Sequence, residues 1–163
     1  INSMGFILDA AKAAMWRGPM LSGAIKQLME STEWGDLDYL FIDMPPGTGD
    51  AYITVAQDLK PDHAILVTTE SSLAIHDTIK SKAVFTKLNI PIAGYIQNMS
   101  SLICPHCNKP LEQEQSLSAL SPLEGLDLTH LGSIPRSDDL LNFRLEESTN
   151  LFVTTYNALK DIL

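Results

Sequence analysis

The chain has 163 residues, of which 45% are hydrophobic, and a formal net charge of −9. This length suits one domain with a sizeable core, and the acidic balance argues against a nucleic-acid surface, which needs clustered lysines and arginines. No apolar run approaches the roughly 20 residues that a membrane-spanning helix needs. The two cysteines are too few for a secreted disulfide framework and favour a cytoplasmic protein.

Apolar segments alternate with amphipathic ones along the chain. We expect these elements in order: a short strand at 3–8, a helix at 19–30, a strand at 37–42, a helix at 51–59 capped by Asp50, a strand at 63–67, a helix at 72–88, strands at 92–96 and 131–134, and a closing helix at 151–163. Strands that alternate with helices predict βαβ units. Because the strands are continuously apolar, the fold class is α/β, a mainly parallel sheet with helices on both faces.

Two of the predicted helices have an apolar face. Helical spacing brings together one set of side chains in the first helix, namely Met20, Leu21, Ala24 and Leu28. The long helix groups a second set, namely Leu73, His76, Ile79, Ala83 and Val84. We expect each helix to bury its apolar face.

The most informative motif is the segment 43–50, Asp-Met-Pro-Pro-Gly-Thr-Gly-Asp, which follows the strand predicted at 37–42. Asp43 then lies at a strand's carboxyl end, where open α/β sheets bind their ligands. Prolines exclude helix here, and Gly47 and Gly49 let backbone N–H groups approach a ligand closely. An acid followed by such a loop suits a Mg-nucleotide site beside the terminal phosphate. The alternative is a strand-ending aspartate followed by an ordinary turn.

The phosphate-binding half of such a site is not in this sequence. A P-loop ends in Gly-Lys-Ser/Thr, and none of the nine glycines is followed by lysine. The chain also opens at Ile1, without a starting methionine. We therefore expect residues 1–163 to be the carboxyl-terminal part of a single P-loop NTPase domain whose Walker A half is absent.

Cys104 and Cys107 are the second chemical feature. Two thiolates at this spacing bind one metal or form a reversible disulfide. Zinc and iron–sulfur centres usually take four protein ligands, and His106 lies inside the same short loop, where ligation would be strained. A two-fold dimer with both loops on its axis would supply four thiolates. Thiol redox exchange and two buried spectator cysteines are the alternatives.

Polar residues also follow two later strands. Asn98 comes after the strand at 92–96 and can read an adenine edge, and Pro135 and Arg136, after the strand at 131–134, can line the same pocket. Ordinary turn residues are the alternative in each case. Arg17 can contact phosphate or remain solvated, and His130, like the other histidines at element edges, is assigned a structural role.

Several motifs together resemble one family. In chain order they are Ser3-Met4-Gly5-Phe6, Trp16-Arg17-Gly18-Pro19-Met20, Trp34-Gly35-Asp36-Leu37-Asp38-Tyr39, the 43–50 loop, Asn98-Met99-Ser100 and Cys104-Pro105-His106-Cys107. This set resembles the Mrp/NBP35 (ApbC) iron–sulfur cluster carriers, which are SIMIBI-class P-loop NTPases with a deviant Walker A motif, related to MinD and the nitrogenase iron protein. The sequence departs from the family at Glu70, where proline is usual, and at 112–121, which lacks the usual glycines and aromatics.

The resemblance implies a role for each nucleotide-site residue. Asp43 would be the Walker B acid that holds Mg²⁺ through water. Gly47, Thr48 and Gly49, with Pro46, would form switch II and sense the γ-phosphate of ATP. Asn98 would contact adenine, and the backbone of Pro135 and Arg136 would flank the base.

The resemblance also implies the overall activity. Cys104 and Cys107 would bind a [4Fe–4S] cluster together with the same pair from a second subunit of a homodimer. The complete protein would hydrolyse ATP and pass the cluster to apo iron–sulfur proteins, whereas this chain alone would be inactive. The alternative is a MinD-like, nucleotide-dependent dimerising scaffold whose cysteine pair holds zinc or acts as thiols, without cluster transfer.

Overall fold

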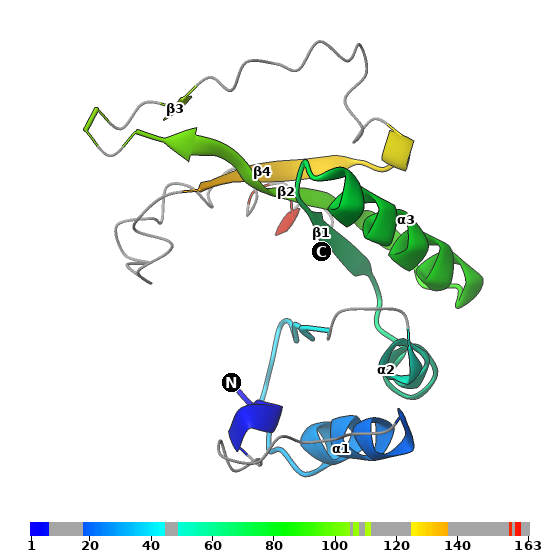
Figure 1. The fold of residues 1–163 in the computed structure, drawn as a ribbon. Helices are drawn as coiled ribbons and strands as arrows, with labels where there is room; N and C mark the ends of the chain where they lie inside the picture. Colours follow the sequence, from blue (N-terminus) through cyan, green and yellow to red (C-terminus); the bar gives the residue numbers. More distant parts are fainter. Residues whose placement is uncertain are drawn as a thin grey trace.

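The computed structural model describes residues 1–6, 18–44, 49–104, 106–107, 110–111, 125–136, 157 and 159–160. Its sheet is built around one long strand, β2 (Ile92–Ile103). Strand β1 (Ala64–Thr68) pairs in parallel with one edge of β2, and β4 (His130–Arg136) pairs in parallel with the other. The short β3 (Pro110–Leu111) returns antiparallel to the end of β2 (Figure 1). The mainly parallel sheet predicted from the sequence is therefore confirmed.

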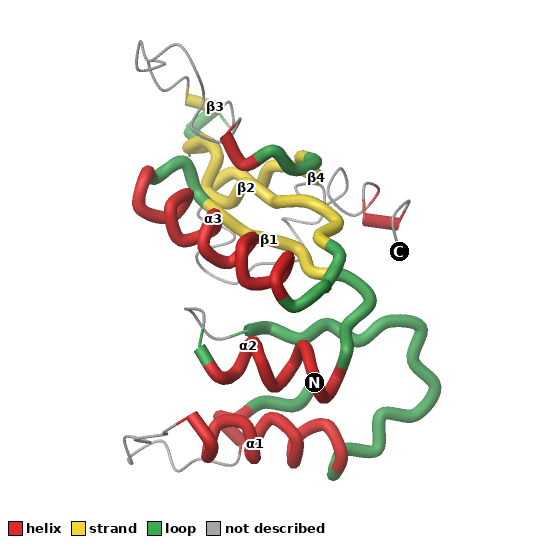
Figure 2. Tube along the Cα trace, turned by 90° about the vertical axis from the view of Figure 1, so that its right-hand side faces the viewer, coloured by secondary structure: helices red, strands yellow, loops and turns green. Residues whose placement is uncertain are grey.

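Helix α3 (Ser72–Lys87) connects β1 to β2 and packs against one face of the sheet (Figures 1 and 2). Its N-cap is Ser71, so it begins at Ser72, and the helix predicted at 72–88 is confirmed. Its buried residues are Ile75, Thr78 and Phe85. Ile75 and Phe85 join a core cluster with apolar residues from β1 and β2.

The face predicted for α3 is wrong. Leu73 is 71% exposed and Ile79 is 44% exposed, and His76 and Ala83 are exposed as well. Helical spacing allows several apolar stripes on this helix, and the stripe that the sheet covers is offset from the one we expected. Val84 alone of the predicted set packs partly against the core.

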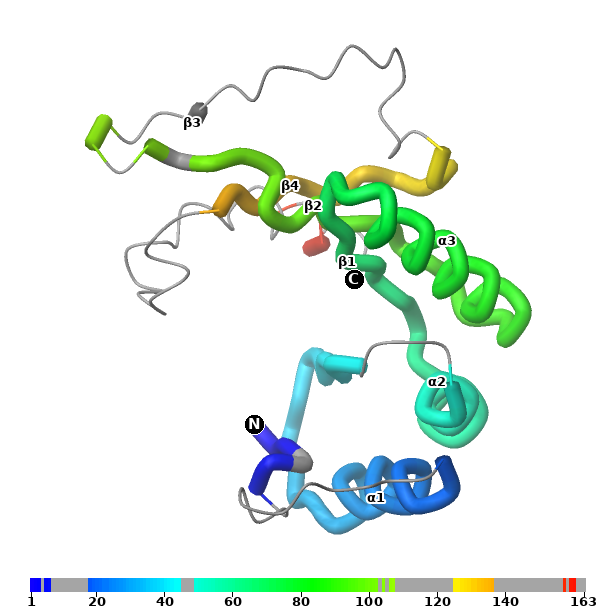
Figure 3. Tube along the Cα trace, in the orientation of Figure 1, coloured from blue at the N-terminus to red at the C-terminus, as the bar shows by residue number. Residues whose placement is uncertain are grey.

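Helices α1 (Gly18–Glu30) and α2 (Asp50–Thr54) lie side by side and run in the same direction (Figure 2). On α1 the predicted face is largely confirmed, because Ala24 is buried and Leu21 and Leu28 are half-buried. Met20, however, is 59% exposed. Figure 3 follows the chain from α1 through an extended segment to α2 and then up into the sheet.

The helix predicted at 51–59 is present but changes type. After α2 the chain continues as the π-helical η2 (Val55–Leu59), closed by a hydrogen bond from the Lys60 N–H to the Val55 carbonyl. Lys60 is left-handed, with φ 47°, and ends the helix before Pro61 as predicted. The predicted cap is wrong, since the N-cap is Gly49 and no side chain caps this helix.

The strand predicted at 37–42 is not formed. Residues 33–44 contain neither helix nor strand, and the apolar side chains of Leu37, Tyr39, Leu40 and Phe41 are exposed. A strand requires a neighbour to pair its N–H and C=O groups, and in the part of the chain that the structure describes this segment has none. The second edge of β1 is likewise unpaired there, and Val67 is 60% exposed.

The remaining predictions differ mainly at their boundaries. The strand predicted at 3–8 is wrong over its described part, because Met4–Phe6 form a 3-10 turn, η1, and residues 7–8 lie outside the described residues. Strand β2 extends well beyond the predicted 92–96, and β4 extends beyond 131–134 at both ends. Of the closing helix only Asn157, Leu159 and Lys160 are described, and all three are helical. No described helix has the length and apolar character needed to cross a membrane.

Candidate nucleotide and metal sites

The cysteine pair lies at the tip of a hairpin. Strand β2 ends at Ile103 and β3 begins at Pro110, and both cysteines lie in the connection between them. Both are free thiols, with Cys104 half-buried and Cys107 exposed. The hairpin extends away from α1, α2 and α3 in Figure 1. The pair is therefore open to a partner and is not a pair of buried spectator cysteines.

The turn favours the thiolate form of Cys104. The backbone N–H groups of His106 and Cys107, and then the Cys107 thiol, form hydrogen bonds to its sulfur and lower the pKa of Cys104, against a smaller opposing effect of burial. A thiolate is the form of cysteine that binds metals. The turn is thus suited to metal binding before any metal arrives.

The number of ligands sets the limit on what one chain can hold. Among the described residues no group of three or more histidine, cysteine or carboxylate side chains is placed to hold a metal ion. Iron–sulfur and tetrahedral zinc centres take four ligands. A complete centre at Cys104 and Cys107 therefore needs ligands from beyond the described part of this chain.

Asn98 lies at a bulge in β2. It pairs with Ile134 of β4, whereas Leu102 pairs with Arg136, so β2 carries extra residues between these two points. Met99 in the bulge is left-handed, with φ 55°, and its N–H donates to the Asn98 Oδ1 at 2.9 Å. Bulges of this kind re-aim side chains beside binding sites. The Asn98 Nδ2 has no partner among the described residues and can donate to a ligand.

The structure brings the three residues of the predicted base pocket together. Asn98 pairs with Ile134, the residue before Pro135, and Arg136 pairs with Leu102 at the far side of the bulge, so the three residues lie on neighbouring strands around this bulge. Pro135 is half-buried, and Arg136 is exposed at the end of β4. Their contact with a base remains a prediction.

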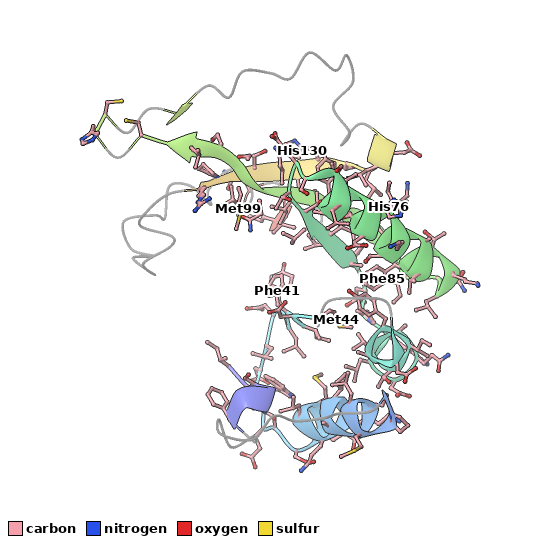
Figure 4. All side chains as sticks on the ribbon, viewed as in Figure 1. Phe41, Met44, His76, Phe85, Met99 and His130 are labelled. Carbon is pink, nitrogen blue, oxygen red and sulfur yellow. The ribbon has the colours of Figure 1, made fainter. Side chains whose placement is uncertain are left out.

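The acidic loop lies apart from that pocket. Asp43 is exposed, and the next residue, Met44, packs against the core cluster beside α2. Gly49 is the exposed N-cap of α2, whereas Gly47 and Thr48, like Arg17, lie outside the described residues. Figure 4 shows Phe41 and Met44 on the side of α1 and α2, well separated from Met99 and His130 on the sheet. Within the described residues, the acidic segment and the base pocket therefore lie apart.

A series of polar contacts beside Asn98 was not expected from the sequence. The Gln97 Nε2 donates to the Glu70 Oε1 at 2.6 Å, and the Ser133 hydroxyl lies 3.3 Å from the Gln97 Oε1 and 3.0 Å from the His130 Nε2. These contacts link the loop after β1 with β2 and β4. Only the strand register, which places Gln97 opposite both Thr68 and Ser133, could have revealed them. His130 also stacks on Tyr95, with ring centroids 5.0 Å apart, which fits the structural role assigned to it.

Sequence comparisons find relatives that are described as iron–sulfur carrier or transfer proteins. The profile of the ParA family described as "NUBPL iron-transfer P-loop NTPase" matches residues 1–160. An "iron-sulfur cluster carrier protein" of Helicobacter pylori is 44% identical over 135 residues, which cover 83% of this chain and 37% of that protein. The "iron-sulfur cluster transfer protein NUBPL" of Mus musculus is 39% identical over 133 residues, which cover 82% and 42%. The chain thus spans less than half the length of these relatives.

Two solved structures share the fold. A nucleotide-binding protein from Archaeoglobus fulgidus in complex with ADP matches with a TM-score of 0.58 and 30% identity, over 76% of this chain and 51% of that one. The cell division ATPase MinD of Pyrococcus furiosus matches with a TM-score of 0.59 and 19% identity, over 90% and 60%. The MinD-like fold expected from the sequence is confirmed.

Proposed function

This chain belongs to the family of NUBPL-type iron-transfer P-loop NTPases, and on that premise we propose that it is the cluster-holding part of an ATP-dependent iron–sulfur cluster carrier. The observation that carries the proposal is the turn of Cys104 and Cys107 at the exposed tip of a hairpin, with Cys104 held toward its thiolate form. The cluster is cargo, which the complete protein would pass to apo iron–sulfur proteins.

The cluster would be shared between two copies of the chain. Each copy contributes two thiolates, and a [4Fe–4S] cluster takes four. A two-fold axis beside the hairpins makes the two half-sites identical, so a homodimer is the simplest completion. The exposure of Cys107 and the projecting hairpin leave room for such pairing. Relatives described as cluster carriers favour this function over a scaffold without cluster transfer.

Nucleotide binding would require both this chain and residues that precede it. We place 1–163 as the carboxyl-terminal part of one P-loop NTPase domain, in which preceding residues supply the phosphate-binding lysine and strand partners for 37–42 and for the second edge of β1. Asp43 would hold Mg²⁺, which neutralises charge on the transferred phosphate. Gly47, Thr48 and Gly49 would sense the γ-phosphate.

The base would bind at the bulge of β2. The Asn98 Nδ2 is a hydrogen-bond donor and suits a ring nitrogen of adenine, which is an acceptor. The backbone of Pro135 and Arg136 would flank the base. Because β2 runs from Asn98 to Ile103, the residue before Cys104, one strand connects the proposed base contact with the proposed cluster ligand.

Free thiols persist in a reducing compartment, and we place the protein in the cytoplasm on that ground.

The test of the proposed function is anaerobic reconstitution of the complete protein with iron and sulfide, followed by transfer to an apo [4Fe–4S] enzyme. We expect visible absorbance of a bound cluster and recovery of the acceptor's activity. Cys104→Ser and Cys107→Ser should each abolish both signals, whereas His106→Ala, in the same turn, should retain them. A protein that binds zinc but neither holds nor transfers a cluster would contradict the proposal.

A further inference from the structure

Helices α1 and α2 meet in a regular seam. Three contacts recur at steps of four residues on both helices, and they are Gly18 with Asp50, Ser22 with Thr54, and Lys26 with Asp58. Four residues are close to one helical turn, so the contacts fix a single register between parallel helices (Figure 2). We refer to these three pairs as the α1–α2 seam.

The closest fit in the seam is at Gly18. A Cβ atom at this position would overlap the Asp50 carboxylate, lying 2.6 Å from its Cγ and 3.2 Å from its Cβ. A Cβ at Gly23, also on α1, would meet nothing within 4 Å. A side chain at position 18 would therefore push the Asp50 carboxylate away from the start of α1. Gly18 belongs to the Trp-Arg-Gly-Pro motif at 16–19, and Asp50 ends the 43–50 loop, so the contact joins two motifs.

The second contact secures the backbone at Asp50. The Thr54 Oγ1 lies 2.6 Å from the Ser22 Oγ and 2.9 Å from the Asp50 carbonyl oxygen. The Thr54 hydroxyl can donate to that carbonyl while it accepts from Ser22, which satisfies both groups. Thr54 is only 7% exposed, so losing this link leaves a buried polar group with fewer partners.

The third contact helps to fix the register between the two helices but adds little to their stability. Lys26 and Asp58 form an ion pair at 3.0 Å, with side chains 47% and 39% exposed. Water screens such pairs, and their effect on stability is small. Asp50 is exposed as well, so its contact with Gly18 acts mainly through shape.

The two helices differ in how they are held. Tyr52 and Ala56 anchor the α2–η2 helix in the core cluster of the sheet. On α1, Ala24 is the one buried residue. The position of α1 therefore depends strongly on its contacts with α2.

We propose that Asp50 is a positioning residue, whose carboxylate, seated on Gly18, joins the start of α2 to the start of α1, so that α1 moves together with Gly49 and Asp50 at the end of the 43–50 loop. The contact itself is independent of any ligand. Its consequence, that a nucleotide at the loop also shifts α1, rests on the proposed nucleotide-binding function.

The test is hydrogen–deuterium exchange of the complete protein, read by mass spectrometry over 18–30 and 49–54. Without nucleotide, Gly18→Ala should speed amide exchange in α1 several-fold. The matched control Gly23→Ala should not, since its new methyl group meets open space. Adding Gly18→Ala to Asp50→Ala should cause little further change, because both variants break the same contact. If Gly18→Ala does not fold, Ser22→Ala tests the seam at the neighbouring contact, with faster exchange in α1 expected.

Mg-ADP separates the possible outcomes. In the wild type it should slow exchange in 49–54 and in α1 together, and in Asp50→Ala only in 49–54. Protection of 49–54 without any change in α1 of the wild type would overturn the proposal, as would equal effects of Gly18→Ala and Gly23→Ala. If Mg-ADP changes neither segment, the proposed nucleotide function fails, while the comparison without nucleotide still decides whether Asp50 positions α1.

Discussion

Cys104 and Cys107 share one turn but differ in their surroundings. The N–H groups of His106 and Cys107 stabilise the Cys104 thiolate and lower its pKa. Because the folded-state pKa is lowered, Cys104 should stay reactive toward iodoacetamide below the ordinary thiol pKa of about 8.5, and lose reactivity only as the pH falls through the lowered value. The Cys107→Ser variant, which keeps a hydroxyl donor, isolates this thiol. Identical pH profiles for the folded protein and the protein in urea would contradict the assignment.

At Gly94, a neighbouring segment of the chain leaves no room for a side chain. The Tyr95 N–H donates to the Thr129 carbonyl oxygen at 2.9 Å, and a Cβ at Gly94 would overlap that oxygen and lie 2.8 Å from the Leu131 Cγ. A backbone oxygen cannot rotate away, so Gly94→Ala should lower the free energy of unfolding by about 1–3 kcal/mol. Urea denaturation measures this. A Cβ at Gly125 meets nothing within 4 Å, so Gly125→Ala should change stability by roughly 0.5 kcal/mol or less. Equal losses would refute the argument.

At the scale of elements, α3 gives the sharpest test of packing. Phe85 is 8% exposed and packs against Tyr52 of α2, with ring centroids 5.3 Å apart. Phe85→Ala should therefore cost about 3–5 kcal/mol of stability. Leu73→Ala, on the same helix but at a site 71% exposed, should stay within roughly 0.5 kcal/mol. Thermal or urea unfolding of both variants measures these losses. A larger loss at Leu73 than at Phe85 would show that the face expected from the sequence is the buried one.

The elements also show what sequence patterns can and cannot predict. Apolar runs and breakers predicted the extent of α1, α3 and β1 within one or two residues, because caps, prolines and periodicity are local. Which apolar stripe of α3 is buried depends on the sheet, and the polar contacts of Gln97 depend on strand register, and neither is local. The 37–42 segment has the composition of a strand, yet pairing needs a neighbour that the described part of the chain does not supply.

At the scale of the whole molecule, the residues of the predicted nucleotide site differ in the observations that support their roles. Asn98, Pro135 and Arg136 lie near one another because neighbouring parallel strands place their carboxyl ends at one edge. The roles of Asp43 and the glycine loop came from a resemblance to a family, and this fold alone leaves Asp43 apart from the base pocket. The seam between Gly18 and Asp50 could not be predicted, since it depends on how two helices pack.

The separation of these parts leads to a prediction about catalysis. Electrostatic contacts from a phosphate-binding lysine and a backbone cradle supply most of phosphoryl-transfer catalysis, and no glycine of this chain is followed by lysine. The chain of 163 residues should therefore release no phosphate from Mg-ATP above background. Assaying the Asp43→Ala variant in parallel distinguishes contaminating activity. Turnover by this chain that Asp43→Ala abolishes would show that the essential groups are already present.

The central claim is that Cys104 and Cys107 hold a cluster only across two chains, and the most direct measurement is native mass combined with iron and zinc analysis. After anaerobic reconstitution we expect a dimer with about four iron atoms per two chains, because the cluster takes four thiolates. The Cys104→Ser/Cys107→Ser double variant should lose the metal and the metal-dependent part of dimerisation. A strictly monomeric chain with one tightly bound metal centre would contradict the claim, and would mean that His106 or a more distant residue completes the ligands.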